Sequence, residues 1–157
     1  MIKVALTNDM ILVRNIITKP EIWEHSVEDS VSLNDFYPET SATAYWLICE
    51  VENVTVGVIS VHYENKTSVK IHPCLLSGYR SHSRRMIIEL FKWLVKMGGE
   101  MQKVNISIPK TRRIVYNLAK NVGFKDEGVN RMSFTKNGKT HDQWLLGLTR
   151  KEIRGML

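Results

Sequence analysis

The feature that most constrains the fold is a strand, an apolar helix and a second strand that follow one another in the middle of the chain. Apolar residues run through Thr67–Leu76 and alternate with polar residues in Lys103–Ile108, as they do in strands. Between them, apolar residues recur at the spacing of a helix with one buried face: Met86, Ile87, Leu90, Phe91, Leu94 and Met97. This unit predicts two parallel strands joined by a right-handed crossover.

Short turns predict that the strands before this unit are antiparallel. Tyr45–Val51 and Val56–Tyr63 are separated by Glu52-Asn53-Val54, and Glu64-Asn65-Lys66 leads into Thr67–Leu76. Turns of this length join antiparallel neighbours, so the three strands form a meander.

The amino-terminal part predicts a short strand and two helices. Ile2–Leu6 has the pattern of a strand, Asn8-Asp9 can cap a helix, and Pro20 can start another turn. Glu28–Thr43 is polar and has no clear period. Long irregular stretches inside compact domains are often functional.

The carboxy-terminal part predicts a second long helix and a closing hairpin. The helix runs from about Lys110 to Asn121, and its expected buried residues are Ile114, Val115, Leu118 and Val122. Asn137-Gly138 is a strong hairpin turn between a strand around Met132–Phe134 and the final strand Trp144–Leu148. We expect that final strand to be exposed, where it could pair with a partner or a second copy of the chain.

The order of elements is therefore β-α-α-β-β-β-α-β-α-β-β, which indicates an α/β fold with a mixed, mostly antiparallel sheet. No repeat or linker divides the chain, and its 157 residues are typical of one domain. We predict a single domain over residues 1–157.

Several patterns bear on where the protein resides. No apolar run approaches the ~20 residues of a membrane span. The first residues lack the apolar stretch of a signal peptide. Cys49 and Cys74 both sit in strand-like apolar runs, which suits a reducing compartment better than a disulfide framework. We expect a cytoplasmic protein, in the host cytoplasm if the source is viral.

The net charge of +6 indicates a surface that attracts anions. Much of the charge falls at two predicted helix starts: Arg80, His82, Arg84 and Arg85, then Lys110, Arg112 and Arg113. A polyphosphate ligand fits that placement, and a solvated basic surface without a ligand is the alternative. Nucleic acid is the least favoured reading, because surface aromatics for base stacking are not evident.

The most informative segment is Tyr79–Arg85, which lies between a strand and an apolar helix. A helix start exposes backbone N–H groups and the positive end of the helix dipole, and these bind phosphate oxygens without a particular side chain. Flanking arginines add charge-assisted contacts. Ser81 and Ser83 are small, although glycine would let a ligand approach the backbone more closely.

This arrangement resembles the GNAT superfamily, the acyl-CoA-dependent N-acyltransferases. Their signature is Arg/Gln-x-x-Gly-x-Gly/Ala, commonly preceded by an aromatic-Arg pair, which Tyr79-Arg80 matches. Ser81, Ser83 and Arg85 stand where the family has glycine or another small residue. The resemblance covers Ile2 to Arg150, and its later matches are Val122-Gly123-Phe124, Glu127-Gly128, and the hairpin Asn137-Gly138-Lys139 with Asp142 behind it.

The resemblance implies a sheet with helices on both faces and a parallel strand pair that splays apart at the cosubstrate, acetyl-CoA or another acyl-CoA. The pantetheine arm would bond to backbone near Cys74, Leu75 and Leu76. The pyrophosphate would sit on the amides of Ser81 to Arg85. The residues expected to bind the rest of the cosubstrate are Arg80, Ser81, His82, Ser83, Arg84, Arg85 and Arg112. No metal is expected.

In the family, an amine attacks the thioester directly, a base takes its proton, and a backbone N–H of the first strand stabilises the oxyanion. His72 is the best base candidate, because imidazole titrates near neutral pH, and His62 and Glu50 are runners-up. The alternative for His72 is a half-buried structural histidine. The family's acid is a tyrosine at the position of Ala119, so Tyr116, earlier on the same helix, is the candidate acid.

The resemblance thus implies an N-acyltransferase that acts on a small-molecule or protein amine. Among the acyl groups, acetyl is the first candidate. The altered phosphate loop and Ala119 support an alternative, a catalytically weak or inactive protein of this fold that acts in assembly or regulation, as some phage-encoded proteins do. The sequence does not name the amine, whose recognition would fall to the loop Glu28–Thr43 and the closing hairpin.

Overall fold

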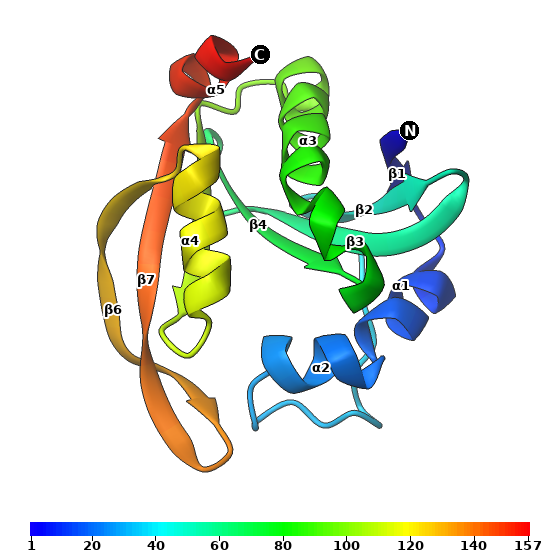
Figure 1. Ribbon diagram of the computed structural model, residues 1–157, viewed down its shortest axis with the longest axis vertical. Helices are drawn as coiled ribbons and strands as arrows, with labels where there is room; N and C mark the ends of the chain where they lie inside the picture. Colours follow the sequence, from blue (N-terminus) through cyan, green and yellow to red (C-terminus); the bar gives the residue numbers. More distant parts are fainter.

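One seven-stranded sheet organises the molecule, and the computed structural model describes all residues, 1–157 (Figure 1). The strands are β1 (Ile2–Thr7), β2 (Ala44–Val51), β3 (Val54–Tyr63), β4 (Ser68–Leu75), β5 (Lys103–Pro109), β6 (Lys125–Lys136) and β7 (Lys139–Thr149). The helices are α1 (Met10–Ile17), α2 (Pro20–Ser26), the short 3₁₀ helix η1 (Ser77–His82), α3 (Ser83–Met97), α4 (Arg113–Val122) and α5 (Arg150–Met156).

The sheet separates two apolar clusters, so helices cover both of its faces. The larger cluster joins α3, α4 and α5 to side chains of β3, β4, β5 and β7. The smaller cluster joins α1 and α2 to Val58 and Cys74 on the opposite face. Side chains alternate along β4, so Val69 and Ile71 pack under α3 while Cys74 packs toward α1 and α2. The expected α/β fold is confirmed.

The strands follow the order β1-β2-β3-β4-β5-β7-β6, and every neighbouring pair is antiparallel except β4 and β5. That parallel pair is short. It holds only at Ser68 with Lys103, Val69 with Val104, and Lys70 with Asn105. Beyond Lys70 the two strands diverge, which confirms the expected splay and divides the sheet into two arms (Figure 1).

Two hairpins turn where the sequence places residues that tolerate positive φ. Glu52 and Asn53 have φ values of 48° and 65°, and Asn137 and Gly138 have values of 52° and 73°. Positive φ at both central residues defines the type I′ turn, whose twist matches that of the strands it joins.

Three expectations were wrong. The final strand β7 is not exposed at an edge, because it lies between β5 and β6, and β6 is the edge strand. Ile114 is 84% exposed, because the inward face of α4 is centred on Val115, Ala119 and Val122. The terminal helix α5 was not predicted, although Thr149 and Glu152 form a capping box at its start.

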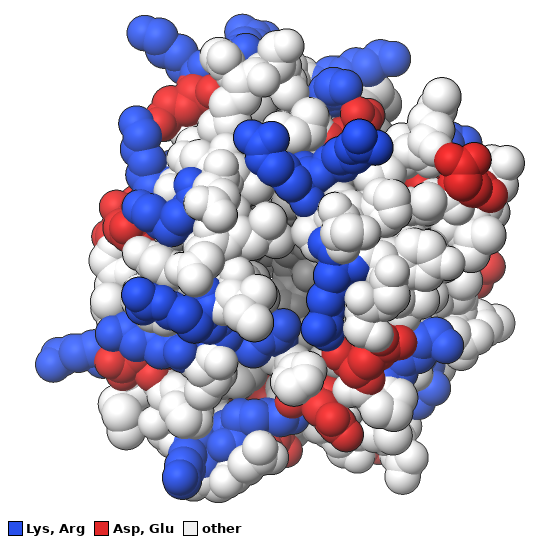
Figure 2. All heavy atoms as spheres, in the orientation of Figure 1, with Lys and Arg blue, Asp and Glu red and all other residues white.

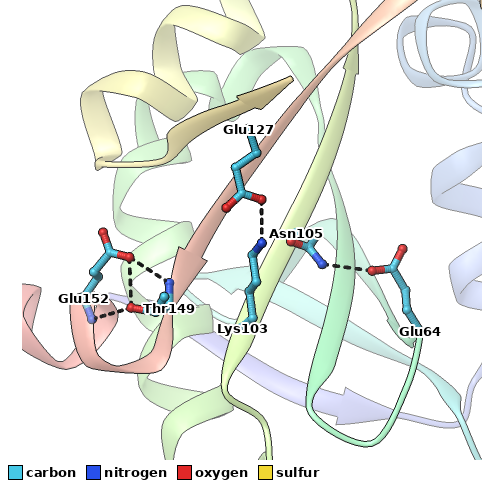
Figure 3. Close-up of polar contacts among 6 residues, drawn as sticks. All are labelled: Glu64, Lys103, Asn105, Glu127, Thr149 and Glu152. Atoms are coloured by element: carbon cyan, nitrogen blue, oxygen red, sulfur yellow. Dashed lines mark hydrogen bonds and ion pairs between the residues drawn. The ribbon is translucent and has the colours of Figure 1, made fainter. Parts of the chain in front are cut away.

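Polar side chains bridge strands on the sheet face opposite α3 (Figure 3). Glu127 reaches from β6 across β7 and pairs with Lys103 of β5 at 2.6 Å. It can do so because Gly147 of β7 has no side chain in the way: a Cβ there would lie 2.6 Å from the Glu127 carboxylate. Asn105 donates to Glu64 at 2.9 Å, beside the last paired residues of β4 and β5. No helix is both long and apolar enough to cross a bilayer.

Two glycine substitutions should differ in their cost to the unfolding free energy, because the added Cβ meets rigid backbone in one case and the end of a flexible side chain in the other. A Cβ on Gly57 would lie 2.5 Å from the Cys74 carbonyl oxygen, which is backbone, so Gly57→Ala should cost about 1–3 kcal/mol. Gly147→Ala displaces only the end of the Glu127 side chain and a half-exposed ion pair, so it should cost less than about 1 kcal/mol.

Urea denaturation of both variants measures the difference in unfolding free energy. Glu127→Ala is the matched control. In that background Gly147→Ala should cost less than it does in the wild type, because the three atoms nearest to the new Cβ all belong to the Glu127 carboxyl group. Equal costs for the two glycine variants would contradict this account of the two contacts.

Candidate functional site

The splay between β4 and β5 opens into a large cavity, with a volume of about 1100 Å³. It appears as a hollow at the centre of the face in Figure 2, with Lys and Arg side chains on both sides of it. Residues of α2, β4, α3, β5 and α4 line it, together with Val31 and Phe36 of the irregular loop. Cavities of this size hold ligands as large as nucleotide cofactors.

The two halves of the cavity differ in chemistry. On the side of α3 and α4 the wall is apolar and includes Met86, Ile87, Val115, Leu118 and Val122. The opposite side faces α2, and side-chain alternation in the strands places polar groups there: Lys70, His72, Ser107 and Gln143. The cavity therefore suits an elongated ligand with an apolar arm on one side and a polar reactant on the other.

The backbone of β4 faces the splay at every second residue. Leu76 donates its N–H to Val56 of β3, so Cys74, two residues earlier, also points its backbone groups at β3. Ile71, Pro73 and Leu75 therefore point theirs into the splay. Proline has no N–H. Between Ile71 and the end of β4, Leu75 supplies the one backbone donor that faces the splay.

His72 lies in the polar half of the cavity, where solvent reaches its imidazole. Protein nevertheless surrounds the ring closely. Desolvation first, and then the positive charges of Arg112 and Lys70, lower the pKa of His72 below its ordinary 6.5. At neutral pH the imidazole is therefore uncharged, which is the form that accepts a proton.

Arg112 spans the mouth of the splay. It precedes α4, and its Nη1 donates to the backbone oxygen of His25 in α2 at 3.1 Å. Its guanidinium acts electrostatically on both His72 and Cys74, which places it in the polar half. Desolvation and the charge of Arg80 lower the pKa of Arg112. No carboxylate pairs with it.

Cys74 lines the same cavity but is an inert thiol. Burial raises its pKa to about 11, and the nearby Ser26 and Arg112 offset this only in part. A nucleophilic cysteine needs a lowered pKa, so the structure gives Cys74 a packing role.

The expected phosphate loop is wound into a helix. Residues Ser77–His82 form η1, whose amides are used in hydrogen bonds three residues apart. The N–H of Ser83 donates to the carbonyl oxygen of Arg80, and so does the Ser83 hydroxyl, at 2.7 Å. Ser77 is held by the Glu21 carboxylate through its N–H, at 2.8 Å, and through its hydroxyl. Arg80 and Ser83 nevertheless line the cavity.

Comparison with known proteins gives a match in fold and none in sequence. No family model matches the chain, and no curated protein does. Among solved structures, the spermidine N-acetyltransferase of Vibrio cholerae in complex with CoA and spermine has a TM-score of 0.81 at 13% identity, over 98% of both chains. An acetyltransferase of the GNAT family from Streptococcus pneumoniae has a TM-score of 0.72 at 11% identity, over 95% of this chain and 99% of that one. The chain has the GNAT fold.

The position at which the GNAT resemblance predicts a tyrosine acid has no acidic side chain in this chain. Ala119 lines the cavity at that position and is buried. Tyr116 does not line it. Its hydroxyl donates to Asp126 at 2.9 Å, and its ring lies 4.3 Å from that of Trp144. The Asp126 hydrogen bond raises the pKa of Tyr116. Its position gives no support to the role of acid.

Half of the residues expected from sequence line the cavity. Those that do are His72, Cys74, Leu75, Arg80, Ser83 and Arg112. Those that do not are Leu76, Ser81, His82, Arg84, Arg85 and Tyr116. Lys70 was missed, although it lies two residues before His72 and so on the same face of β4.

The β6–β7 hairpin closes one end of the cavity by docking on the segment after α2. Asp29 accepts the N–H groups of Asn137 and Gly138 at 3.0 and 2.9 Å. Glu28 accepts the N–H of Thr135, and Lys136 donates to the carbonyl oxygen of Val27 at 2.7 Å. These bonds connect the β6–β7 hairpin, which belongs to one arm of the sheet, to the segment after α2, which packs on the other arm.

The docked hairpin should be sensitive to acid. The N–H groups of Gly138 and Asn137 lower the pKa of Asp29 below its ordinary 3.8. A lowered carboxyl pKa means that the contact is fully stabilising above about pH 4 and is lost as pH falls through the folded value. In amide NMR spectra, the Gly138 signal should therefore titrate with a midpoint below 3.8 in the wild type.

Asp29→Asn is the control, because it keeps the shape and removes the charge. The Gly138 amide should show no such titration in that variant. A midpoint at or above the ordinary value in the wild type would contradict the hydrogen bonds described.

Proposed function

We propose that this protein is an acyl-CoA-dependent N-acyltransferase, and that acetyl-CoA is the first acyl donor to consider. The observation that carries the proposal is the cavity at the splay of β4 and β5, because it combines an apolar channel, Arg80 of η1 just before α3 and an uncharged histidine. The GNAT fold supports it at the general level. The acyl-CoA arm would lie along the apolar wall of α3 and α4, with Arg80 beside its phosphates.

The reaction that fits this cavity is direct transfer. A neutral amine enters from the α2 side and its nitrogen bonds to the thioester carbon. The bond from that carbon to sulfur then breaks, and CoA leaves as a thiolate that takes a proton from solvent. His72 accepts the proton of the ammonium formed, directly or through one water. A thiolate is a tolerable leaving group near neutral pH, so transfer does not require a protein acid.

Specific features favour a second candidate, a GNAT-fold protein with weak catalysis that acts through a partner. The N–H of Ser83 in the phosphate loop is already bonded to Arg80, Pro73 leaves one splay-facing donor between Ile71 and the end of β4, and Ala119 replaces the family tyrosine. Each change removes a group that would stabilise bound cosubstrate or the transition state. None of them fills the cavity.

Calorimetric titration with acetyl-CoA tests the proposal. Arg80 forms no ion pair and lines the cavity from η1, just before α3, so Arg80→Glu should weaken acetyl-CoA binding at least about tenfold. Arg154→Glu, an equal charge change on exposed α5, is the matched control and should leave affinity unchanged.

Thiol release then separates the two candidates. Binding with turnover of an amine supports the transferase. Binding without turnover of any amine favours the second candidate. Absence of binding, or equal weakening by both arginine variants, would remove the cosubstrate site.

A further inference from the structure

The cavity carries positive charge that the protein does not neutralise. Its charged lining residues are Lys70, Arg80, Arg112 and Arg113 against Glu21 and Glu28. None of the four basic side chains forms an ion pair. Glu21 holds Ser77 and Glu28 accepts the N–H of Thr135 with one oxygen each, and two negative charges face four positive ones. Uncompensated charge in a recess attracts ions of opposite sign.

Part of this charge lies where the acceptor would bind, and not where the cosubstrate phosphates would bind. Arg80 belongs to η1, just before α3. Lys70 is on the α2 face of β4, two residues from His72, and Arg112 bonds across to His25 of α2. Successive side chains on one face of a strand are about 7 Å apart. Lys70 therefore lies one short ligand length from His72.

We infer that the acceptor is a small amine that also carries a carboxylate, and that Lys70 and Arg112 bind this carboxylate while the amine faces His72. The inference rests on the proposed acyltransferase function, whose acceptor class it specifies. Ser107 and Gln143, both neutral and polar, line the same half and can hold such a ligand by hydrogen bonds.

The same charges disfavour a polyamine. The Vibrio cholerae structure contains spermine, a polycation. In this chain a polycation would place a second ammonium group beside Lys70 or Arg112, neither of which pairs with a carboxylate, in a lining with four basic side chains and two acidic ones. Like charges at close range in a partly desolvated site repel strongly. This cavity therefore selects against the ligand seen in its structural neighbour.

Three amines with the same four-carbon chain test the inference: γ-aminobutyrate, butylamine and putrescine. They differ only in the far group, which is a carboxylate, a methyl group or a second ammonium. With acetyl-CoA as cosubstrate, kcat/KM should fall in that order, with at least about a tenfold difference between the first and last. A parallel titration measures binding of each amine to the protein saturated with CoA.

Charge reversal supplies the internal control. Lys70→Glu should reverse the order of γ-aminobutyrate and putrescine, while Lys151→Glu on exposed α5 should leave the order unchanged. Rates or affinities that favour putrescine in the wild type, or an order that Lys70→Glu leaves intact, would overturn the inference.

The two proposals fail differently. If the amines bind in the expected order but none is acetylated, the carboxylate site stands and the transferase fails. If acetylation occurs without preference for γ-aminobutyrate, the transferase stands and the carboxylate site fails. If CoA does not bind, the amines are titrated alone, and equal affinity for all three overturns the carboxylate site.

Discussion

His72→Gln should lower kcat for acetyl transfer by about two to four orders of magnitude, the usual contribution of a positioned general base. The imidazole of His72 is uncharged at neutral pH, and it lies in the polar half of the cavity, where an amine entering from the α2 side would lose its proton. The affinity for acetyl-CoA should stay unchanged, because the cosubstrate phosphates lie near Arg80. Thiol release and calorimetry measure the two effects separately.

The pH dependence of the reaction rate identifies the group that takes the proton. Burial, with help from Arg112 and Lys70, lowers the pKa of His72 in the free protein, and the neutral form is active. The value of kcat/KM, expressed per neutral amine, should therefore rise with pH through a midpoint below 6.5 and then level off. His62→Gln is the matched control, since His62 is an exposed histidine of β3 outside the cavity lining. An unchanged profile in His72→Gln would show that another group takes the proton.

The fold was predictable because the strongest sequence signals are local. Helix-period apolar residues defined α3, and turn residues such as Asn137-Gly138 defined the hairpins. The errors came from signals that need the third dimension. Ile114 belongs to an apolar run, but its exposure depends on which face of α4 meets the sheet. The capping box of α5 was an exception, because its pattern was readable in the sequence.

The site was predictable in part from β4 and in part from the strand-to-helix turn that follows it, where Arg80 and Ser83 line the cavity as expected. His72 and Leu75 could be placed in the cavity from β4 alone. Tyr116 could not, because its hydrogen bond to Asp126 depends on how β6 returns past α4. Arg112 was expected at the cosubstrate, yet it bonds to His25, more than eighty residues earlier in the chain. Such a contact has no local signal.

The effect of Pro73 also has no local signal in the sequence. It becomes visible only when the direction of each backbone group in β4 is known. Ile71 and Pro73 flank His72 and both face the splay, and Pro73 is the one farther from the paired part of β4 and β5, so it adjoins the place where a thioester carbonyl would be attacked. A backbone donor at that place would stabilise the developing oxyanion, and loss of one such donor typically costs about 10²–10³ in rate. Proline provides none.

Pro73→Ala should therefore raise kcat, by about tenfold or more, because it introduces an N–H that points into the splay. Pro73→Gly introduces the same N–H and should act in the same direction, although glycine weakens a strand. The affinity for acetyl-CoA should change little, since the thioester carbonyl of the ground state carries less charge than the oxyanion. Burst and steady-state thiol release measure the rate. If both variants leave kcat unchanged, the reaction does not use β4 to stabilise charge, and the weakly catalytic alternative loses one of its three supports.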